Sequence, residues 1–376
     1  MMEPVILANS KFSIGLLKVL CKATTGNVLF SPLSISSALG PIVLGAKNNT
    51  ADQMLKGLRF GKMRIMYHYL FEEIYKEGEY KNLEPNHKMK RSLQLVNRLF
   101  GDKTVNFYDD YLDHCEEWCF ASLRSVDFKN NPEAAREKIN SWVASETDNK
   151  IMELLDQGDV SKDTSLALIS SMHFRRNWLN AFKKGNGAAM FKTDTLPLGT
   201  IPHRQYQLPT EAQILEIPYE NNHLSMLTIL PKTIDGLPKL VDSITYEKIM
   251  EWTEPDNMIP TEVNVEMPSF KLQEKYDLEK ALTALGITDL FSDKCDLSGM
   301  APGPLKLSKV VHKCVVEVDE KGTDAEGGGG GVVKTLQSNK ITESFKVKSP
   351  FLFFIRHNST KSILFWGRVT PPPPVI

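Results

Sequence analysis

The chain has few cysteines, no excess of either charge and no long apolar run, and each shortage excludes a class of protein. Its five cysteines are an odd, low number for 376 residues and predict no disulfide framework. The 45 basic and 46 acidic residues give a net charge of -1, so no overall field attracts nucleic acid or a membrane. No stretch reaches the ~18 apolar residues of a transmembrane helix. Met1–Pro4 also lack the basic and apolar parts of a signal peptide. We therefore expect a cytoplasmic protein, with unconventional secretion left open.

Signatures of catalysis and of metal binding are missing as well. The sequence has no phosphate-binding Walker loop, no nucleophile elbow, no His-Glu-x-x-His and no Cys-x-x-Cys. His114, Cys115 and Cys119 are spaced at one helical turn, which a metal site would allow, but two ordinary thiols are the simpler interpretation. The sequence therefore predicts no enzyme, no metal and no cofactor.

What the chain does contain is a change of pattern along its length. The first two-thirds alternates helical and strand patterns, with helices expected at 12–20, 31–44, 66–76 and 132–143 and strands at 93–100 and 164–174. Thr50 and Gln53 fit a capping box that opens a further helix. The last third is dense in strand patterns, at 224–230, 262–267, 305–318, 351–355 and 363–369. These patterns predict an α+β fold, and no linker divides residues 1–376, so we expect one domain.

The most unusual segment is a loop of small residues between two strand patterns. Gly322-Thr323-Asp324-Ala325-Glu326 is followed by five glycines at 327–331. A loop of this length without structure of its own is uncommon in a compact domain and is usually functional or disordered. We interpret it as a loop that changes shape.

The side-chain parity of this loop suits a strand that inserts into a sheet. Alternate side chains of a strand point to opposite faces, so one set would face the core. That inward set holds no charge: Thr323, Ala325, Gly327, Gly329, Gly331 and Val333. The outward set holds Asp324 and Glu326, and a slip of one residue would bury both carboxylates.

The glycines oppose insertion without preventing it. Each one costs roughly 0.5–1 kcal/mol relative to alanine in a strand, whereas a new central strand gains about a dozen hydrogen bonds at ~1 kcal/mol each. Insertion is therefore expected at equilibrium, but ordering a flexible segment slows it, so part of the protein would behave as a substrate. The other interpretation is a flexible glycine linker that does not insert.

Several blocks of the sequence resemble the serpin family. Asn27 to Leu39, Asn-Val-Leu-Phe-Ser-Pro-Leu-Ser-Ile-Ser-Ser-Ala-Leu, resembles the second-helix signature of serpins. The further matching blocks are 44–50, 291–292, 296–300, 310–313, 319–323, 350–358 and 363–368. The resemblance spans nearly the whole chain. The leaderless start and His357-Asn358 resemble the intracellular ovalbumin-type clade.

The resemblance implies a serpin fold with three β-sheets, eight or nine helices and an exposed reactive-centre loop at 320–344. It implies a monomer that catalyses nothing and inhibits a serine protease as a suicide substrate. The protease cleaves the loop, which then inserts into the central sheet and distorts the acyl-bound enzyme. The alternative is a serpin-fold binding or chaperone protein whose loop is cleaved without insertion.

The resemblance also assigns residues within the loop. The hinge consists of Glu320, Gly322, Thr323, Asp324 and Ala325. About sixteen residues beyond Glu320 the reactive bond falls at Leu336–Gln337, which favours a chymotrypsin-like or elastase-like protease. Lys334 and Lys340 are alternative reactive residues and would suit a trypsin-like protease.

Beneath the central sheet, the resemblance implies a polar cluster that governs sheet opening. Its members are Ser31, Ser34, Ser170 and His312. Serpins usually have asparagine at the position of Ser170 and glycine at that of Arg176, so we expect a weaker or water-filled network here. Trp178 matches the tryptophan at which the loop first inserts.

Overall fold

The computed structural model describes residues 2–60, 67–76, 93–119, 122–174, 176–184, 190–192, 204–208, 212–260, 263–319 and 343–370. The described chain forms two compact units, each assembled from segments that are distant in sequence. Unit 1 comprises Met1–Leu20, Phe30–His173 and Gln273–Val315, and unit 2 comprises Cys21–Leu29, Phe174–Leu272 and Val316–Ile376. The single domain expected for 1–376 stays a prediction.

Helices and three β-sheets make up the described residues, which confirms the α+β class and the number of sheets. The helix predicted at 31–44 is split into α2 (Pro32–Ala38) and α3 (Gly40–Gly45), with Pro41 in the first turn of α3. Counting this pair as one gives nine α-helices in the described ranges. The others are α1 (Glu3–Ala23), α4 (Asn48–Gly57), α5 (Tyr67–Lys76), α6 (Asp109–Trp118), α7 (Pro132–Glu146), α8 (Leu237–Ser243), α9 (Tyr246–Trp252) and α10 (Glu279–Ala284).

A five-stranded sheet has the order β12-β13-β4-β2-β3. Its strands are β12 (Phe270–Asp277), β13 (Lys309–Val318), β4 (Leu166–Phe174), β2 (Leu93–Asp102) and β3 (Ser122–Val126). All nine residues of β4 are buried, as expected for a central strand covered on both faces. β13 begins at Lys309 rather than at the predicted 305, and it is the direct neighbour of β4.

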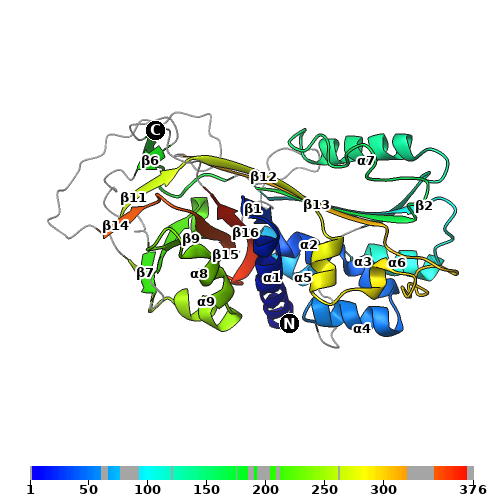
Figure 1. Ribbon diagram of the computed structural model, residues 1–376, viewed down its shortest axis with the longest axis horizontal. Coiled ribbons are helices and arrows are strands. Elements are labelled where there is room, and N and C mark those ends of the chain that lie inside the picture. The colour runs from blue at the N-terminus through cyan, green and yellow to red at the C-terminus, as the bar shows by residue number, and fades with distance from the viewer. Residues whose placement is uncertain are drawn as a thin grey trace. The chain divides into compact units, whose positions relative to one another are not determined.

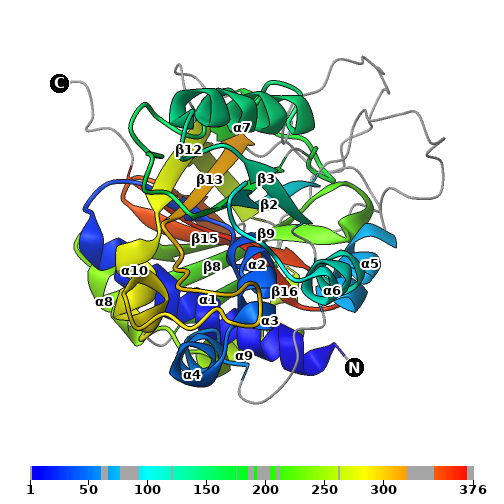
Figure 2. The same cartoon turned by 90° about the vertical axis from the view of Figure 1, so that its right-hand side faces the viewer.

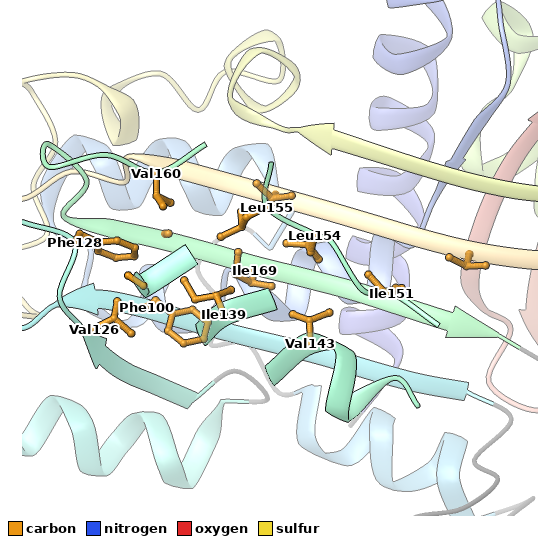
Figure 3. Packing of buried hydrophobic residues seen from close by; sticks show 14 residues of the cluster. Phe100, Val126, Phe128, Ile139, Val143, Ile151, Leu154, Leu155, Val160 and Ile169 are labelled. Atoms are coloured by element: carbon orange, nitrogen blue, oxygen red, sulfur yellow. The ribbon is translucent and has the colours of Figure 1, made fainter. Parts of the chain in front are cut away.

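Helix α7 covers one face of this sheet, while α2 lies on the opposite side (Figures 1 and 2). Ile139 and Val143 of α7 belong to a core that also contains Ile169 of β4 (Figure 3). The segment that follows α7 adds further apolar side chains to the same core: Ile151, Leu154, Leu155 and Val160. We call residues 147–165 the strap, because they cross back over the sheet before β4 begins.

Asn140 of α7 connects the strap to the helix through hydrogen bonds. Its side-chain amide donates to the carbonyl of Leu155 at 2.9 Å, and its Oδ1 accepts from the N–H groups of Leu154 and Leu155 at 3.1 and 2.8 Å. Lysines on the sheet add ion pairs: Lys275 bridges Asp156 and Asp159, each at 2.7 Å. The strap is therefore held by both hydrogen bonds and charge.

The remaining strands form two further sheets. The seven-stranded sheet has the order β1-β16-β15-β9-β8-β7-β10, and α8 lies against β9 (Figure 1). Its strands are β1 (Val28–Phe30), β16 (Ser362–Val369), β15 (Phe351–His357), β9 (Leu224–Pro231), β8 (Ala212–Pro218), β7 (Arg204–Leu208) and β10 (Ile259–Pro260). The four-stranded sheet has the order β14-β11-β6-β5, from β14 (Glu343–Lys346), β11 (Val263–Pro268), β6 (Met190–Lys192) and β5 (Lys183–Lys184).

Helix α1 departs from the expectation that no segment could span a membrane. Among the described helices it alone has the length and composition of a span, with a mean hydropathy of 1.4. Leu16 and Leu17 are fully buried, and 56% of the apolar window lies inside the protein. The finding is weak evidence for a membrane, because the core helix of a soluble protein passes the same test.

The capping box predicted at Thr50 and Gln53 is wrong. Helix α4 begins at Asn48, two residues earlier, with Lys47 at the N-cap. Thr50 lies inside the helix and its hydroxyl accepts the N–H of Asp296 at 2.9 Å, while Gln53 accepts the N–H of Asp289 at 2.9 Å. Both side chains therefore satisfy main-chain groups of a distant segment instead of their own helix.

Candidate functional site

The four residues predicted to form the sheet-opening cluster lie together. Ser31 is the N-cap of α2, Ser34 lies in its first turn, Ser170 is on β4 and His312 is on β13, and none is more than 1% exposed. The main-chain N–H of Ser31 donates to Nε2 of His312 at 3.0 Å. Nδ1 of His312 lies 2.9 Å from the Ser170 hydroxyl, which lies 2.8 Å from the Ser34 hydroxyl. The cluster therefore connects α2 to both β4 and β13.

The contact between Ser31 and His312 determines which nitrogen of the imidazole carries the proton. A main-chain N–H can only donate, so Nε2 of His312 is the acceptor and the ring proton is on Nδ1. Nδ1–H then donates to Ser170, and the Ser170 hydroxyl donates to Ser34 because the Ser34 proton is given to Asn97. The chain ends on a side chain that the sequence analysis missed, because the Ser34 hydroxyl donates to Oδ1 of Asn97 at 3.1 Å.

Asn97 on β2 completes the cluster. Its amide nitrogen donates to the carbonyl of Ser34 at 3.1 Å and to the hydroxyl of Ser37 at 3.0 Å. The weak network expected from Ser170 is thus supported by an amide on the next strand. A signal was present in the sequence: Asn97 follows Val96 inside the predicted strand 93–100, and a buried amide requires partners.

Burial lowers the pKa of His312 to about 3, so the imidazole is neutral over the physiological range. The Cys314 thiol lies 3.1 Å from Nε2, and the Ser31 hydroxyl donates to the sulfur of Met172 at 3.0 Å. Protonation of Nε2 would place a donor opposite the donating N–H of Ser31. The cluster is therefore compatible only with neutral histidine.

Trp178, the predicted first point of loop insertion, lies in unit 2. Its indole N–H donates to the carbonyl of Asp319 at 2.8 Å, one residue beyond the end of β13. Its ring stacks on Tyr219, with the centroids 4.5 Å apart and the planes 12° apart. The tryptophan therefore contacts the chain immediately before the predicted hinge.

The hinge and reactive residues lie outside the described residues. They are Glu320, Gly322, Thr323, Asp324, Ala325, Lys334, Leu336, Gln337 and Lys340. On either side of them, the described chain ends β13 at Val318 and resumes in β14 at Glu343, which pairs in parallel with Val263 of β11. Among the described residues, no group of three or more His, Cys, Asp or Glu side chains could hold a metal ion.

Comparison with known families agrees with this architecture. The sequence model of the family described as "Serpin (serine protease inhibitor)" matches residues 7–372. The chain belongs to the serpin family. Among curated serpins, human Serpin B4 is 40% identical over 97% of this chain and 98% of its own length. The leukocyte elastase inhibitor of Equus caballus is 39% identical over 99% of this chain and 100% of its own length.

Solved serpin structures have the same fold. Uncleaved ovalbumin superposes with a TM-score of 0.84 at 29% identity, covering 98% of this chain and 100% of ovalbumin. Maspin superposes with a TM-score of 0.85 at 26% identity, covering 99% of each chain. The serpin fold predicted from the sequence is therefore confirmed.

Proposed function

We propose that this serpin inhibits a serine protease as a single-use suicide substrate. The observation that carries the proposal is the join between β4 and β13, which are direct neighbours and are both bonded to the Ser31–His312 cluster. The loop leaves the end of β13, and its uncharged alternate residues would suit a strand placed between these two. Cleavage would free the loop to separate β4 from β13 and to gain a new set of ladder hydrogen bonds.

The names of the relatives support inhibition over the binding-protein alternative. Relatives from horse, mouse and human are named leukocyte elastase inhibitors. An elastase-like or chymotrypsin-like target fits Leu336 as the residue that enters the specificity pocket. Lys334 and Lys340 would instead select a trypsin-like protease.

The decisive experiment mixes the purified serpin with elastase, chymotrypsin or trypsin and separates the products on a denaturing gel. Trapping gives a covalent complex that survives denaturation, together with loss of protease activity. The cleaved serpin should also unfold at a much higher temperature than the intact one. Clean cleavage with full protease activity and no rise in unfolding temperature would contradict the proposal.

The alternation of inward and outward side chains along the loop provides a matched pair of variants. Thr323→Arg places a charge in the inward set, so the complex should be lost and the serpin should be cleaved as a substrate. Asp324→Arg places the same charge in the outward set, and complex formation should persist. Equal behaviour of the two variants would reject insertion in this register.

The reactive bond is tested by mass spectrometry of the C-terminal peptide released on cleavage. Cleavage at Leu336–Gln337 releases a peptide that begins at Gln337. Leu336→Arg should transfer inhibition from elastase or chymotrypsin to trypsin. Lys334→Ala and Lys340→Ala should leave inhibition of elastase or chymotrypsin unchanged. A peptide that begins at Thr335 or Ile341 would reassign the bond to one of the lysines.

We also propose a monomer that acts in the cytoplasm. The five cysteines are free thiols, which suits a reducing compartment. Sedimentation of the purified serpin and fractionation of the producing cells test these two expectations, including any release of the protein into the medium.

A further inference from the structure

Two thiols at the C-terminal end of α6 are not explained by protease inhibition. The main-chain N–H of Cys119 donates to the carbonyl of Cys115 at 3.0 Å, so the two residues are one helical turn apart. Four residues at 1.5 Å rise separate their Cα atoms by roughly 6 Å, within the Cα range of a disulfide. Cβ atoms one turn apart in a regular helix are roughly 5–6 Å apart, so the bond requires Cys119, which is extended at the C-cap of α6, to move toward Cys115. Their thiols also hydrogen-bond to each other.

The surroundings fix where these thiols lie. Tyr111 hydrogen-bonds to Cys115 through its side chain, and its hydroxyl donates to the carbonyl of Pro41 in α3 at 2.7 Å. The sulfur of Cys119 lies against Gly40, where an added Cβ would be 3.8 Å away. Cys115 is 1% exposed and Cys119 is half-buried, so solvent reaches the pair through Cys119.

We propose that Cys115 and Cys119 form a redox-active dithiol, which a peroxide converts into a reversible intramolecular disulfide. The sulfur of Cys119 attacks one peroxide oxygen, the O–O bond breaks and hydroxide leaves, giving a sulfenic acid. The sulfur of Cys115 then attacks the sulfenic sulfur, forming the S–S bond and releasing a second hydroxide. The two thiol protons convert the hydroxides into two waters, and two electrons pass from the sulfurs to the peroxide.

The hydrogen bond between the sulfurs assists this chemistry. It lowers the pKa of Cys115, against burial, and it raises that of Cys119 together with burial. The pair therefore gives up one proton readily and holds the second. The two thiols titrate as a pair, so the first proton is lost by the pair rather than by one sulfur, and the accessible sulfur of Cys119 can react first.

Acidic side chains on the same helix should slow oxidation of the two thiols. Asp113, Glu116 and Glu117 are exposed on α6 and disfavour a nearby thiolate. Screening by salt weakens this repulsion. Oxidation should therefore be faster at high ionic strength than at low ionic strength.

One tryptic peptide reports the reaction directly. The sequence between Lys103 and Arg124 contains no other trypsin site, so the peptide 104–124 carries both cysteines. Treatment of the folded protein with hydrogen peroxide, followed by alkylation under denaturing conditions, should give this peptide with two hydrogens fewer and no alkyl group. Dithiothreitol should restore two alkylatable thiols.

Matched variants separate this pair from the other half-buried thiols. Cys119→Ser should abolish the internal disulfide, whereas Cys295→Ser should leave it unchanged. Complex formation with a protease is not part of the readout, so failure of the inhibitory proposal would leave this result unaffected. Peptide 104–124 that keeps two free thiols after Cys21 or Cys295 has been oxidised, or that ends as a sulfinic acid without the cross-link, would overturn the proposal.

Discussion

The main-chain N–H of Ser31 and Nε2 of His312 are 3.0 Å apart, and this contact fixes the protonation state of the buried polar cluster. Because the N–H can only donate, the ring is neutral and its proton lies on Nδ1. Together with the Ser34 hydroxyl, which donates to Oδ1 of Asn97, this contact sets the direction of every hydrogen bond from His312 through Ser170 and Ser34 to Asn97. The join between β4 and β13 therefore depends on one neutral imidazole.

Acidification should weaken the folded state through this histidine. Burial lowers the pKa of His312 from 6.5 to about 3, so the unfolded chain takes up a proton that the folded chain excludes. This contribution to stability is present above pH 6.5 and is lost as the pH falls toward 3, at about 1.4 kcal/mol per pH unit.

His312→Gln, which does not titrate, should show a correspondingly flatter loss of stability over that range. Denaturant unfolding at a series of pH values measures it. Parallel curves for wild type and His312→Gln would contradict the prediction.

Removal of the Asn97 side chain should destabilise the cluster more than its size suggests. Asn97→Ala leaves the Ser34 hydroxyl without its acceptor and the Ser37 hydroxyl without a donor. Each unsatisfied buried group costs about 1–3 kcal/mol, so we expect a loss of about 2–4 kcal/mol in the free energy of unfolding.

The control for Asn97 is Gln94→Ala on the same strand, whose partly buried side chain donates to Asp148. Gln94→Ala should lower the free energy of unfolding by less than about 1 kcal/mol. Urea unfolding of both variants compares them. An Asn97→Ala variant as stable as Gln94→Ala would mean that the amide contributes little to the cluster.

Asn140→Ala should release the strap from α7. The substitution leaves the N–H groups of Leu154 and Leu155 without their acceptor and should cost about 2–3 kcal/mol. Hydrogen exchange should accelerate selectively at these two amides. Lys138→Ala, exposed on the same helix, provides the comparison and should leave both exchange rates unchanged.

Asp159→Asn should weaken the contact between the strap and the sheet through charge. Asp159 lies 2.7 Å from Lys275 and 3.3 Å from Lys309, and all three side chains are about four-fifths buried. We expect a loss of about 1–3 kcal/mol, between the values for exposed and for buried pairs. High salt should reduce the difference from wild type.

The carboxylate of Asp159 predicts a second effect of acid on the stability of the fold. Burial opposes ionisation of Asp159, but hydrogen bonds and the charge of Lys275 outweigh burial and lower its pKa. Its contribution is present at neutral pH and is lost as the pH falls through the lowered pKa. Asp163→Asn, exposed in the same strap, should change neither stability nor its salt dependence.

Local pattern predicted much of the fold, and tertiary partners account for what it missed. Helix α5 (Tyr67–Lys76) lies within the range predicted at 66–76, and its apolar residues at helical spacing, Tyr67, Leu70, Phe71 and Ile74, are buried. Helix α7 begins at Pro132, the first residue of the range predicted at 132–143. These features depend on residues within one or two turns of each other, so the sequence around them is sufficient.

The residues whose roles were not predicted correctly have partners that are far away in the sequence. Gln53 and Thr50 bond to residues 236 and 246 positions away, which no local capping rule includes. Asn97 meets its partners on α2 about sixty residues earlier. The resemblance located Ser31, Ser34, Ser170 and His312 because it supplied such long-range information. It omitted Asn97 because no quoted motif contained that residue.

The indole of Trp178 provides a built-in optical probe. Its N–H is bonded to Asp319 and its ring is stacked on Tyr219, so its emission depends on the chain directly before the loop. Any event that pulls this segment away would expose the ring to a different environment and shift its spectrum. Of the five tryptophans, this one would let the first moments after proteolytic attack be followed in real time without an added label.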